Sequence, residues 1–268
     1  MSPSRTSRIR PVRPAVVGAL ALLVLLAGCG GAVSSGDATT ATDTTTTPLP
    51  PGVNETGVVP QDLANAHGSS LSETAYEVNY TTRVTYANGT VYAAISRSGS
   101  VAASDHYTAT VEQRGAWTPV GVGPRVAYYA DGDTTRRLIV GWDGSESVSP
   151  PREASAVVVE RLGLVDDDRL YQLLVSAESV EVSPAPANDG PTVIRLAGAQ
   201  PIAPSYVSDP GSANATLRVN ADGVVTELTV TYGATVDGER VRVETTVRYD
   251  ALGEATVERP EWAETDDG

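Results

Sequence analysis

Few residues of this chain have the types and spacing that catalysis or metal binding requires. The two histidines, His67 and His106, have no Cys, Glu or second His at ligand spacing, so we expect no zinc site. Asp166-Asp167-Asp168 offers carboxylates but lacks the alternating oxygen ligands and the glycine of a calcium loop; it is better interpreted as a helix cap. The chain has no Gly-x-Ser-x-Gly elbow, P-loop or dinucleotide fingerprint. We therefore expect no enzyme activity, no metal and no cofactor, with an unrecognised carboxylate pair as the enzymatic alternative.

The single cysteine, Cys29, ends the sequence Leu26-Ala27-Gly28-Cys29, which matches the lipobox of lipoprotein precursors. In that pattern the thiol takes a diacylglyceryl group and the chain is cut just before it. The apolar run Ala15 to Ala27 follows four arginines without an Arg-Arg pair, and it is short for a membrane span. We expect residues 1–28 to be a Sec-type signal peptide, and Cys29 to anchor the protein by lipid on the extracellular face of the cell membrane. An ordinary signal peptide with a nearby cysteine is the alternative.

The charge balance excludes one class of partner. All 19 basic residues are arginine, against 33 Asp and Glu, and removing residues 1–28 leaves 15 arginines and a formal charge of −18. Such a chain repels nucleic acid, so no nucleic-acid binding is expected. A strongly acidic chain without Lys or Phe is typical of proteins that work in near-saturating salt, where self-repulsion is screened. A moderately acidic protein of a GC-rich mesophile is the alternative.

Composition divides the rest of the chain into three parts. Residues 29–58 hold Thr44-Thr45-Thr46-Thr47 and then Pro48, Pro50 and Pro51, a Thr/Pro-rich pattern that predicts a stalk. Residues 59–262 have the apolar periodicity of one folded domain, and residues 263–268 form an acidic tail.

Most of the domain is predicted to be β-structure with a few short helices. Tyr76 to Tyr86 alternates apolar and polar residues, as a strand with one buried face does, and Asn88-Gly89 predicts a type I′ hairpin turn. Similar strands are expected near 105–111, 125–129, 135–142, 180–182, 192–196, 215–219, 225–232 and 241–249. Helices are expected from Pro60, with Leu63, His67 and Leu71 on one stripe, from Glu153 to about Gly163, and after Asp168.

A resemblance to a known family rests on short motifs near the C-terminal end. The strand, Asp-Gly turn and strand over 215–228, and the segment 248–253 followed by Val257, Pro260 and Trp262, resemble the closing strands of LolA-like and LppX-like lipoprotein carriers. With the lipobox, the stalk and the helix at Leu63, the chain is also similar to uncharacterised surface lipoproteins of haloarchaea. The resemblance implies an unclosed, curved antiparallel half-barrel of about 9–11 strands, with 2–3 short helices on its concave face.

The same resemblance implies an apolar cavity for a lipid-like ligand. Residues on the apolar parity of the expected strands are its candidate lining: Tyr76, Val78, Tyr80, Val84, Tyr86, Leu228, Val230, Tyr232, Val243 and Val247. Ordinary core packing is the alternative explanation for the aromatic residues among them.

Four Asn-x-Ser/Thr sequons are candidate glycosylation sites, at Asn54, Asn79, Asn88 and Asn214. Taken together, these patterns predict a membrane-anchored extracellular lipoprotein that binds an apolar or amphipathic ligand. The alternative is a non-enzymatic surface protein that docks on an envelope partner whose identity the sequence does not give.

Overall fold

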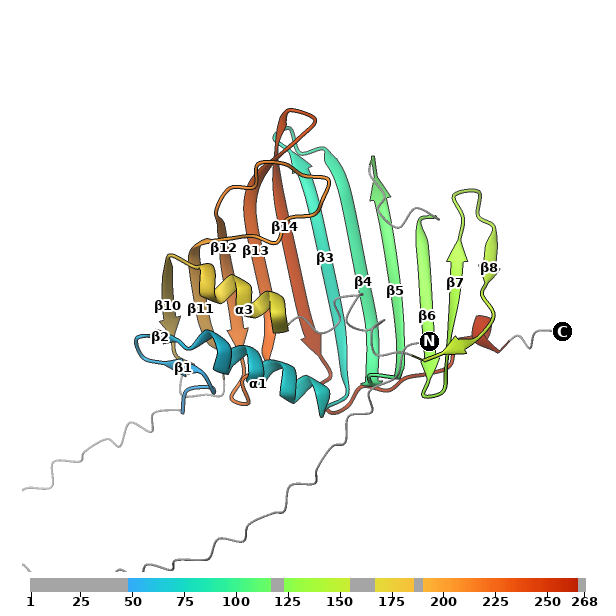
Figure 1. The fold of residues 1–268 in the computed structure, drawn as a ribbon, viewed down its shortest axis with the longest axis horizontal. Helices are drawn as coiled ribbons and strands as arrows, with labels where there is room; N and C mark the ends of the chain where they lie inside the picture. The colour runs from blue at the N-terminus through green and yellow to red at the C-terminus, as the bar shows by residue number, and fades with distance from the viewer. Residues whose placement is uncertain (1–47, 117–122, 155–166, 186–189, 265–268) are drawn as a thin grey trace, which may run out of the picture. The chain divides into compact units, whose positions relative to one another are not determined.

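The computed structural model describes residues 48–116, 123–154, 167–185 and 190–264, all within one folded unit, Thr44–Gly268. Its centre is a large antiparallel sheet in the order β10-β11-β12-β13-β14-β3-β4-β5-β6-β7-β8, with β9 paired to β7 (Figure 1). The two end strands of this order, β10 and β8, do not pair with each other, so the sheet is unclosed. This confirms the predicted fold class, a mainly β domain built on a large unclosed antiparallel sheet.

The twelve strands of the sheet have the following bounds: β3 (Tyr76–Tyr86), β4 (Val91–Ala103), β5 (His106–Gly115), β6 (Arg125–Asp131), β7 (Thr134–Val140), β8 (Glu146–Val148), β9 (Arg152–Glu153), β10 (Ser179–Ser183), β11 (Thr192–Ala199), β12 (Ala213–Val219), β13 (Val225–Val236) and β14 (Glu239–Asp250). The described part of the chain also contains the helices α1 (Pro60–Ser72) and α3 (Asp167–Ser176), a 3-10 turn η1 (Glu261–Ala263), and a two-stranded sheet of β1 (Val53–Asn54) and β2 (Gly57–Val58).

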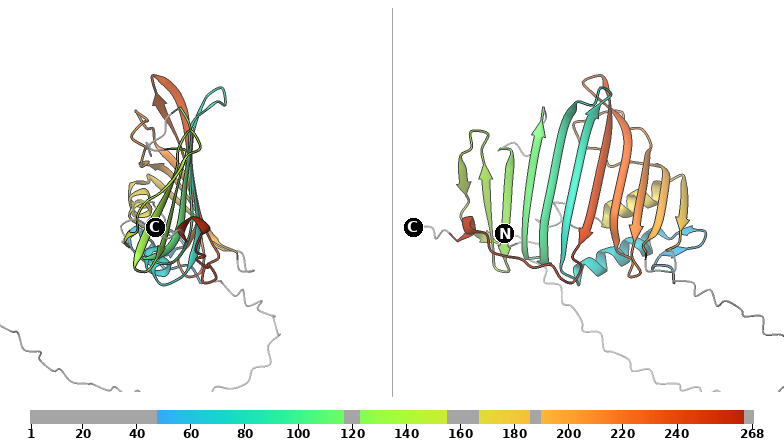
Figure 2. Two further views of the ribbon diagram at one scale, coloured as in Figure 1. Left: turned by 90° about the vertical axis from the view of Figure 1, so that its right-hand side faces the viewer. Right: turned by 180° about the vertical axis from the view of Figure 1, so that it is seen from behind.

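Both helices lie on the same face of the sheet, across the strands from β10 to β14 (Figures 1 and 2). Helix α1 starts at a proline, which fits the first helical position, and buries Leu63, His67 and Leu71, as their spacing predicts. Helix α3 has Asp167 and Asp168 in its first turn and buries three leucines beneath it. We call the side of the sheet under these helices the helix-covered face, and the opposite side the open face.

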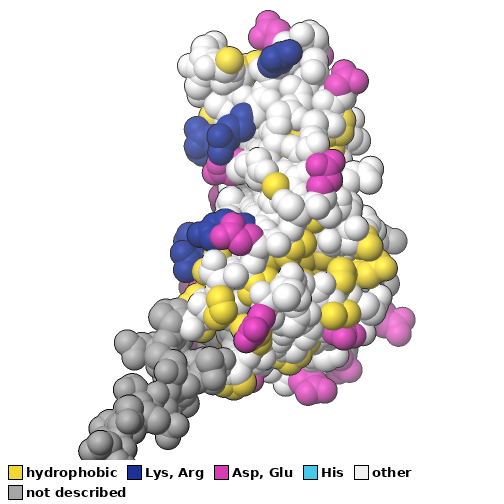
Figure 3. Space-filling view, turned by 90° about the vertical axis from the view of Figure 1, so that its left-hand side faces the viewer, with side chains coloured by type: hydrophobic (Ala, Val, Ile, Leu, Met, Phe, Trp, Pro, Cys, Tyr) yellow, Lys and Arg dark blue, Asp and Glu magenta, His cyan; other side chains and the backbone are white. Residues whose placement is uncertain are grey.

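Alternation along the strands gives the two faces different compositions. In β12 the burial pattern changes strictly from residue to residue, with Leu217 buried and Arg218 exposed. The buried residues of β11 to β14 form a core with those of α3 and Leu63 of α1, and a second core joins β3, β4 and β5 with Leu71. Seen from the β10 edge, arginine side chains gather along one side of the molecule and most hydrophobic side chains along the other (Figure 3).

Two hairpin turns of similar sequence, Asp237-Gly238 and Asn88-Gly89, differ in type. Asp237 and Gly238 both have positive φ, 51° and 83°, and join paired Val236 and Glu239 as a two-residue type I′ turn does. The type I′ prediction at Asn88-Gly89 was wrong. The residues 87–89 form a three-residue loop closed by Tyr86 and Thr90, in which only the glycine has positive φ. Three-residue loops that end in a left-handed residue are a common hairpin connection after the two-residue turns.

The structure also differs from the predictions for one helix, the number of strands and the stalk. Residues 152 and 153 form β9, so the predicted helix does not begin at Glu153, and the rest of that prediction, 155–163, lies outside the described residues. The short strands β8 and β9 take the sheet to twelve strands instead of 9–11. Within the expected stalk, Val53 is buried in the core and Leu49 and Val58 pack against it. The predicted signal peptide (1–28), Cys29 and the predicted stalk up to residue 47 lie outside the described residues, so these predictions are not tested.

Candidate functional site

A pocket opens on the helix-covered face between the sheet, α3 and the chain that follows β11. It encloses about 460 Å³, part of it open to solvent. Its lining is mostly apolar and comes from four elements and one loop: Tyr80, Arg169, Leu173, Ile202, Leu228, Val230, Tyr232, Thr245 and Val247. We call this space the apolar chamber.

The strand register brings the floor of the apolar chamber together. Tyr80 of β3 lies opposite Val247 of β14, and Val247 lies opposite Leu228 of β13. Because alternate residues of a strand share a face, Val230 and Tyr232 project to the same side as Leu228. Three strands that are distant in the sequence therefore supply one continuous surface.

The roof comes from a helix and a loop. Arg169 and Leu173 are four residues apart in α3, one helical turn, so both face the chamber. Ile202 closes another side and is itself 46% exposed, which places an apolar side chain at the mouth. The opening is thus lined by groups that an apolar ligand would contact on entry.

A second space of about 600 Å³ adjoins the first and shares Tyr80, Arg169 and Ile202 with it. Its other lining residues are more polar: Thr82, Ile95, Arg97, Ala203, Pro204, Ser205 and Tyr206. We call it the polar chamber. The shared residues make the two chambers parts of one groove with an apolar and a polar end.

Side-chain contacts fix the boundary between the chambers. The Thr82 hydroxyl lies 3.0 Å from the Thr245 hydroxyl and donates to the Tyr80 hydroxyl at 3.2 Å. The guanidinium of Arg97 lies over the Tyr80 ring, with its carbon 4.8 Å from the ring centre, a cation–π distance. Tyr80 therefore connects the polar and the apolar ends.

Some buried polar atoms of the groove have no hydrogen-bond partner within the described part of the chain. These include Nη1 of Arg97 and the hydroxyl of Tyr232. Burial, with the nearby Tyr80 and Tyr206, raises the pKa of Tyr232. Burial first, and the neighbouring Tyr80 and Tyr92 second, raise the pKa of Tyr206 to about 12. Both phenols are therefore neutral at physiological pH and can donate hydrogen bonds.

The ten residues predicted to line a cavity divide into two groups. Five of them line the apolar chamber: Tyr80, Leu228, Val230, Tyr232 and Val247. The other five pack elsewhere: Val84 and Val243 in the first core, Tyr76 and Val78 in the second, and Tyr86 edge-on against Tyr92.

Four residues of the groove were not predicted from the sequence: Arg97, Arg169, Leu173 and Ile202. One signal was available for Arg97. It lies on β4 on the same parity as Ile95 and Val101, so a charge occurs in an otherwise apolar row. Nothing in the sequence places the other three near this strand.

His67 has a structural role. It is 2% exposed, its Nδ1 accepts a hydrogen bond from the Val225 N–H at 3.2 Å, and its ring packs edge-on against Tyr249. Burial lowers its pKa from 6.5 to about 4, and Asp167 opposes this shift. Within the described ranges, no group of three His, Cys, Asp or Glu side chains could hold a metal ion.

The four sequon asparagines are all exposed. Asn79 and Asn214 are on the open face, because their parity is opposite to that of the buried residues of β3 and β12. The side chains of Asn54 and Asn88 each accept a hydrogen bond from the backbone N–H of the sequon threonine. No helix among the described residues is long and apolar enough to cross a membrane.

A family model described as a family of unknown function, DUF7537, matches residues 14–266. The chain belongs to the DUF7537 family. No curated protein matches it.

Solved structures give remote likenesses. The chain is similar to LprF from Mycobacterium bovis, with 12% identity and a TM-score of 0.40 over 76% of this chain and 99% of that one. It is also similar to a LolA superfamily protein from Nitrosomonas europaea, with 11% identity and a TM-score of 0.26 over 78% and 98%. A putative outer membrane lipoprotein-sorting protein domain from Vibrio parahaemolyticus has 8% identity and a TM-score of 0.25 over 75% and 94%. Likenesses at this level do not assign a function to a DUF7537 member.

Proposed function

We propose that this protein is a lipid-anchored envelope protein that binds an apolar or amphipathic ligand in the groove of its helix-covered face. The observation that carries the proposal is the apolar chamber, about 460 Å³ between three strands, α3 and Ile202. Ligand pockets typically have mostly apolar walls and a few polar groups. The chamber has this kind of lining, and its contents would be held by burial of apolar surface.

Anchoring through Cys29 is the second part of the proposal. The lipobox Leu26–Cys29 and the basic, apolar segment before it support export, cleavage and attachment of lipid to the thiol. The acidic, lysine-free composition supports the proposal that the protein functions in high salt on the outer side of the membrane, as in a haloarchaeon. The exposed sequons are candidate sites for glycans on that side.

Ligand binding is tested by purifying the protein from membranes in high salt and measuring the mass of the intact domain by native mass spectrometry. We expect an adduct that organic extraction removes. Leu228→Trp, which fills the chamber, should abolish the adduct, whereas Thr229→Trp on the open face of the same strand should keep it. A domain without an adduct, or an adduct that Leu228→Trp retains, would overturn the proposal. A partner recovered by cross-linking through the open face would instead favour a docking protein.

Anchoring is tested separately with Cys29→Ser. The variant should leave the membrane fraction and appear in the medium or soluble fraction, while the native chain stays with the membranes. A native chain that is soluble without detergent would contradict the anchor and leave the ligand proposal unaffected.

A further inference from the structure

The groove differs in charge from the rest of the chain. The sequence holds 33 Asp and Glu against 19 Arg, yet no Asp or Glu is among the described residues that line either chamber, and two arginines are. An excess of positive charge in a hollow of an acidic protein favours one sign of ligand, because low-dielectric walls strengthen the field inside it.

Arg97 has an unsatisfied group there. It projects from β4 on the helix-covered face, its guanidinium lies over the Tyr80 ring, and its buried Nη1 has no hydrogen-bond partner among the residues that the structure describes. A guanidinium has five N–H donors and cannot lose its charge, so an unpaired nitrogen in a buried position is costly. An anionic oxygen in the polar chamber would supply the missing acceptor.

Further donors surround the same position. Arg169 lines both chambers, and Tyr206 lines the polar chamber together with Arg97. Burial raises the pKa of Tyr206 and outweighs the charge of Arg97, which lowers it. Two guanidinium groups and a neutral phenol make a site that matches carboxylate or phosphate oxygens.

We propose that the ligand is an amphiphile with an anionic headgroup, a carboxylate or a phosphate ester, held by Arg97 with Arg169, and an acyl chain in the apolar chamber. The inference rests on the proposed function and adds the sign and position of the headgroup. Tyr80 and Ile202, which line both chambers, are where the head and the chain of such a ligand would meet.

The test measures binding of a fluorescent fatty acid and of the alcohol with the same chain to the delipidated protein. The acid should bind about 10- to 100-fold more tightly than the alcohol, the range expected for charge-assisted hydrogen bonds. Arg97→Gln should remove most of this preference, so that acid and alcohol bind with similar affinity. Arg97→Lys should keep part of it, and Arg218→Gln on the open face should keep all of it.

The outcomes separate the two proposals. Equal binding of acid and alcohol to the native protein would overturn the headgroup inference and leave the apolar pocket standing, whereas binding of neither would overturn the proposed function. An undiminished preference in Arg97→Gln, with its fold verified by circular dichroism, would also overturn the inference. Inorganic phosphate alone should not displace the fatty acid at millimolar concentration; displacement would indicate a free-anion site in place of a lipid site.

Discussion

The two faces of the sheet come from the same strands but are held by different forces. On the helix-covered face, Val, Leu, Ala and Tyr pack in two cores beneath α1 and α3. On the open face, Thr, Ser, Arg and Glu form cross-strand rows such as Thr81 with Thr246 and Glu227 with Arg248. Burial of apolar area is worth far more than exposed polar contacts, so the stability of the domain should come almost entirely from one face.

Adjacent residues of β12 give the largest expected effect. Leu217 is 0% exposed in the core under the helices, and Arg218 beside it projects to the open face. Leu217→Ala should lower the free energy of unfolding by about 2–5 kcal/mol, through lost burial and a residual cavity. Arg218→Ala should change it by about 1 kcal/mol or less. Unfolding of both variants in guanidinium chloride measures these changes. Equal losses of unfolding free energy would contradict the contrast between the faces.

The next largest expected effect is a pH dependence of stability, which arises from the buried histidine of α1. His67 titrates at about 4 when folded and near 6.5 when unfolded, so the unfolded chain binds the proton more readily. The contribution of neutral His67 to the free energy of unfolding is fully present above pH 6.5. It is lost as the pH falls toward 4, which lowers the free energy of unfolding by roughly 3 kcal/mol. Protonation of Nδ1 would also break the hydrogen bond from Val225.

Thermal unfolding between pH 7 and 4 measures this loss. His67→Gln, whose amide oxygen can accept from the same N–H, should flatten the curve over that interval. An unchanged slope in the variant would assign the loss to carboxylates such as Asp131, whose pKa is lowered chiefly by the backbone N–H of Thr134.

Much of the fold could be predicted because its strands have one buried face. Alternation in β3 and β14 fixes both their type and their orientation, since a shift of one residue would turn Val243 and Val247 to solvent. Helix α3 could be predicted from its acidic first turn and three leucines. The strands β8 and β9 are three and two residues long, too short to show a period, and were missed for that reason.

The site could be predicted only in part. Tyr80, Leu228 and Val247 were found because parity alone places them on the inner face. Val84 and Val243 have the same parity but are buried in the core. Which inward-facing residues line the chamber therefore depends on where α3 and the loop at Ile202 lie. Those segments are distant in the sequence, and local periodicity contains no information about such contacts. Arg97 was missed because the half of β4 after Ile95 has few large apolar residues.

Buried and exposed threonines offer a smaller, matched comparison within β3. Thr82 is buried and its hydroxyl bonds to Thr245 and Tyr80, whereas Thr81 is exposed on the open face. Thr82→Val should lower the free energy of unfolding by about 1 kcal/mol, because it removes a hydrogen bond and leaves polar partners buried. Thr81→Val should change it by less than about 0.5 kcal/mol. Urea unfolding distinguishes the two variants, and a larger loss for Thr81→Val than for Thr82→Val would contradict the contrast between the faces.

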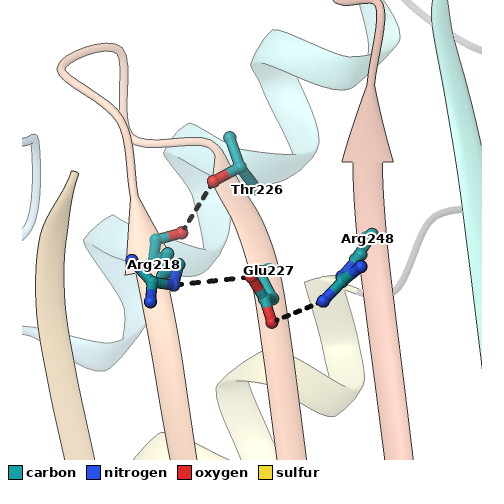
Figure 4. A network of polar contacts seen from close by, with 4 residues as sticks. All are labelled: Arg218, Thr226, Glu227 and Arg248. Atoms are coloured by element: carbon teal, nitrogen blue, oxygen red, sulfur yellow. Dashed lines mark hydrogen bonds and ion pairs between the residues drawn. The ribbon is translucent and has the colours of Figure 1, made fainter. Parts of the chain in front are cut away.

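The smallest effect is expected for the ion pairs of the open face. Glu227 lies between Arg218 and Arg248, at 3.4 and 3.3 Å, and the hydroxyl of Thr226 donates to the Arg218 carbonyl (Figure 4). The Glu227 side chain is 31% exposed and both arginine side chains are more than half exposed, so water and salt screen the attraction. Glu227→Gln should therefore lower the free energy of unfolding by less than about 1 kcal/mol in dilute buffer. In molar salt the difference should vanish, since the screening length falls to about 3 Å. A loss that persists in salt would mean that the network contributes more than screened ion pairing, and it would contradict the expected contrast between the two faces.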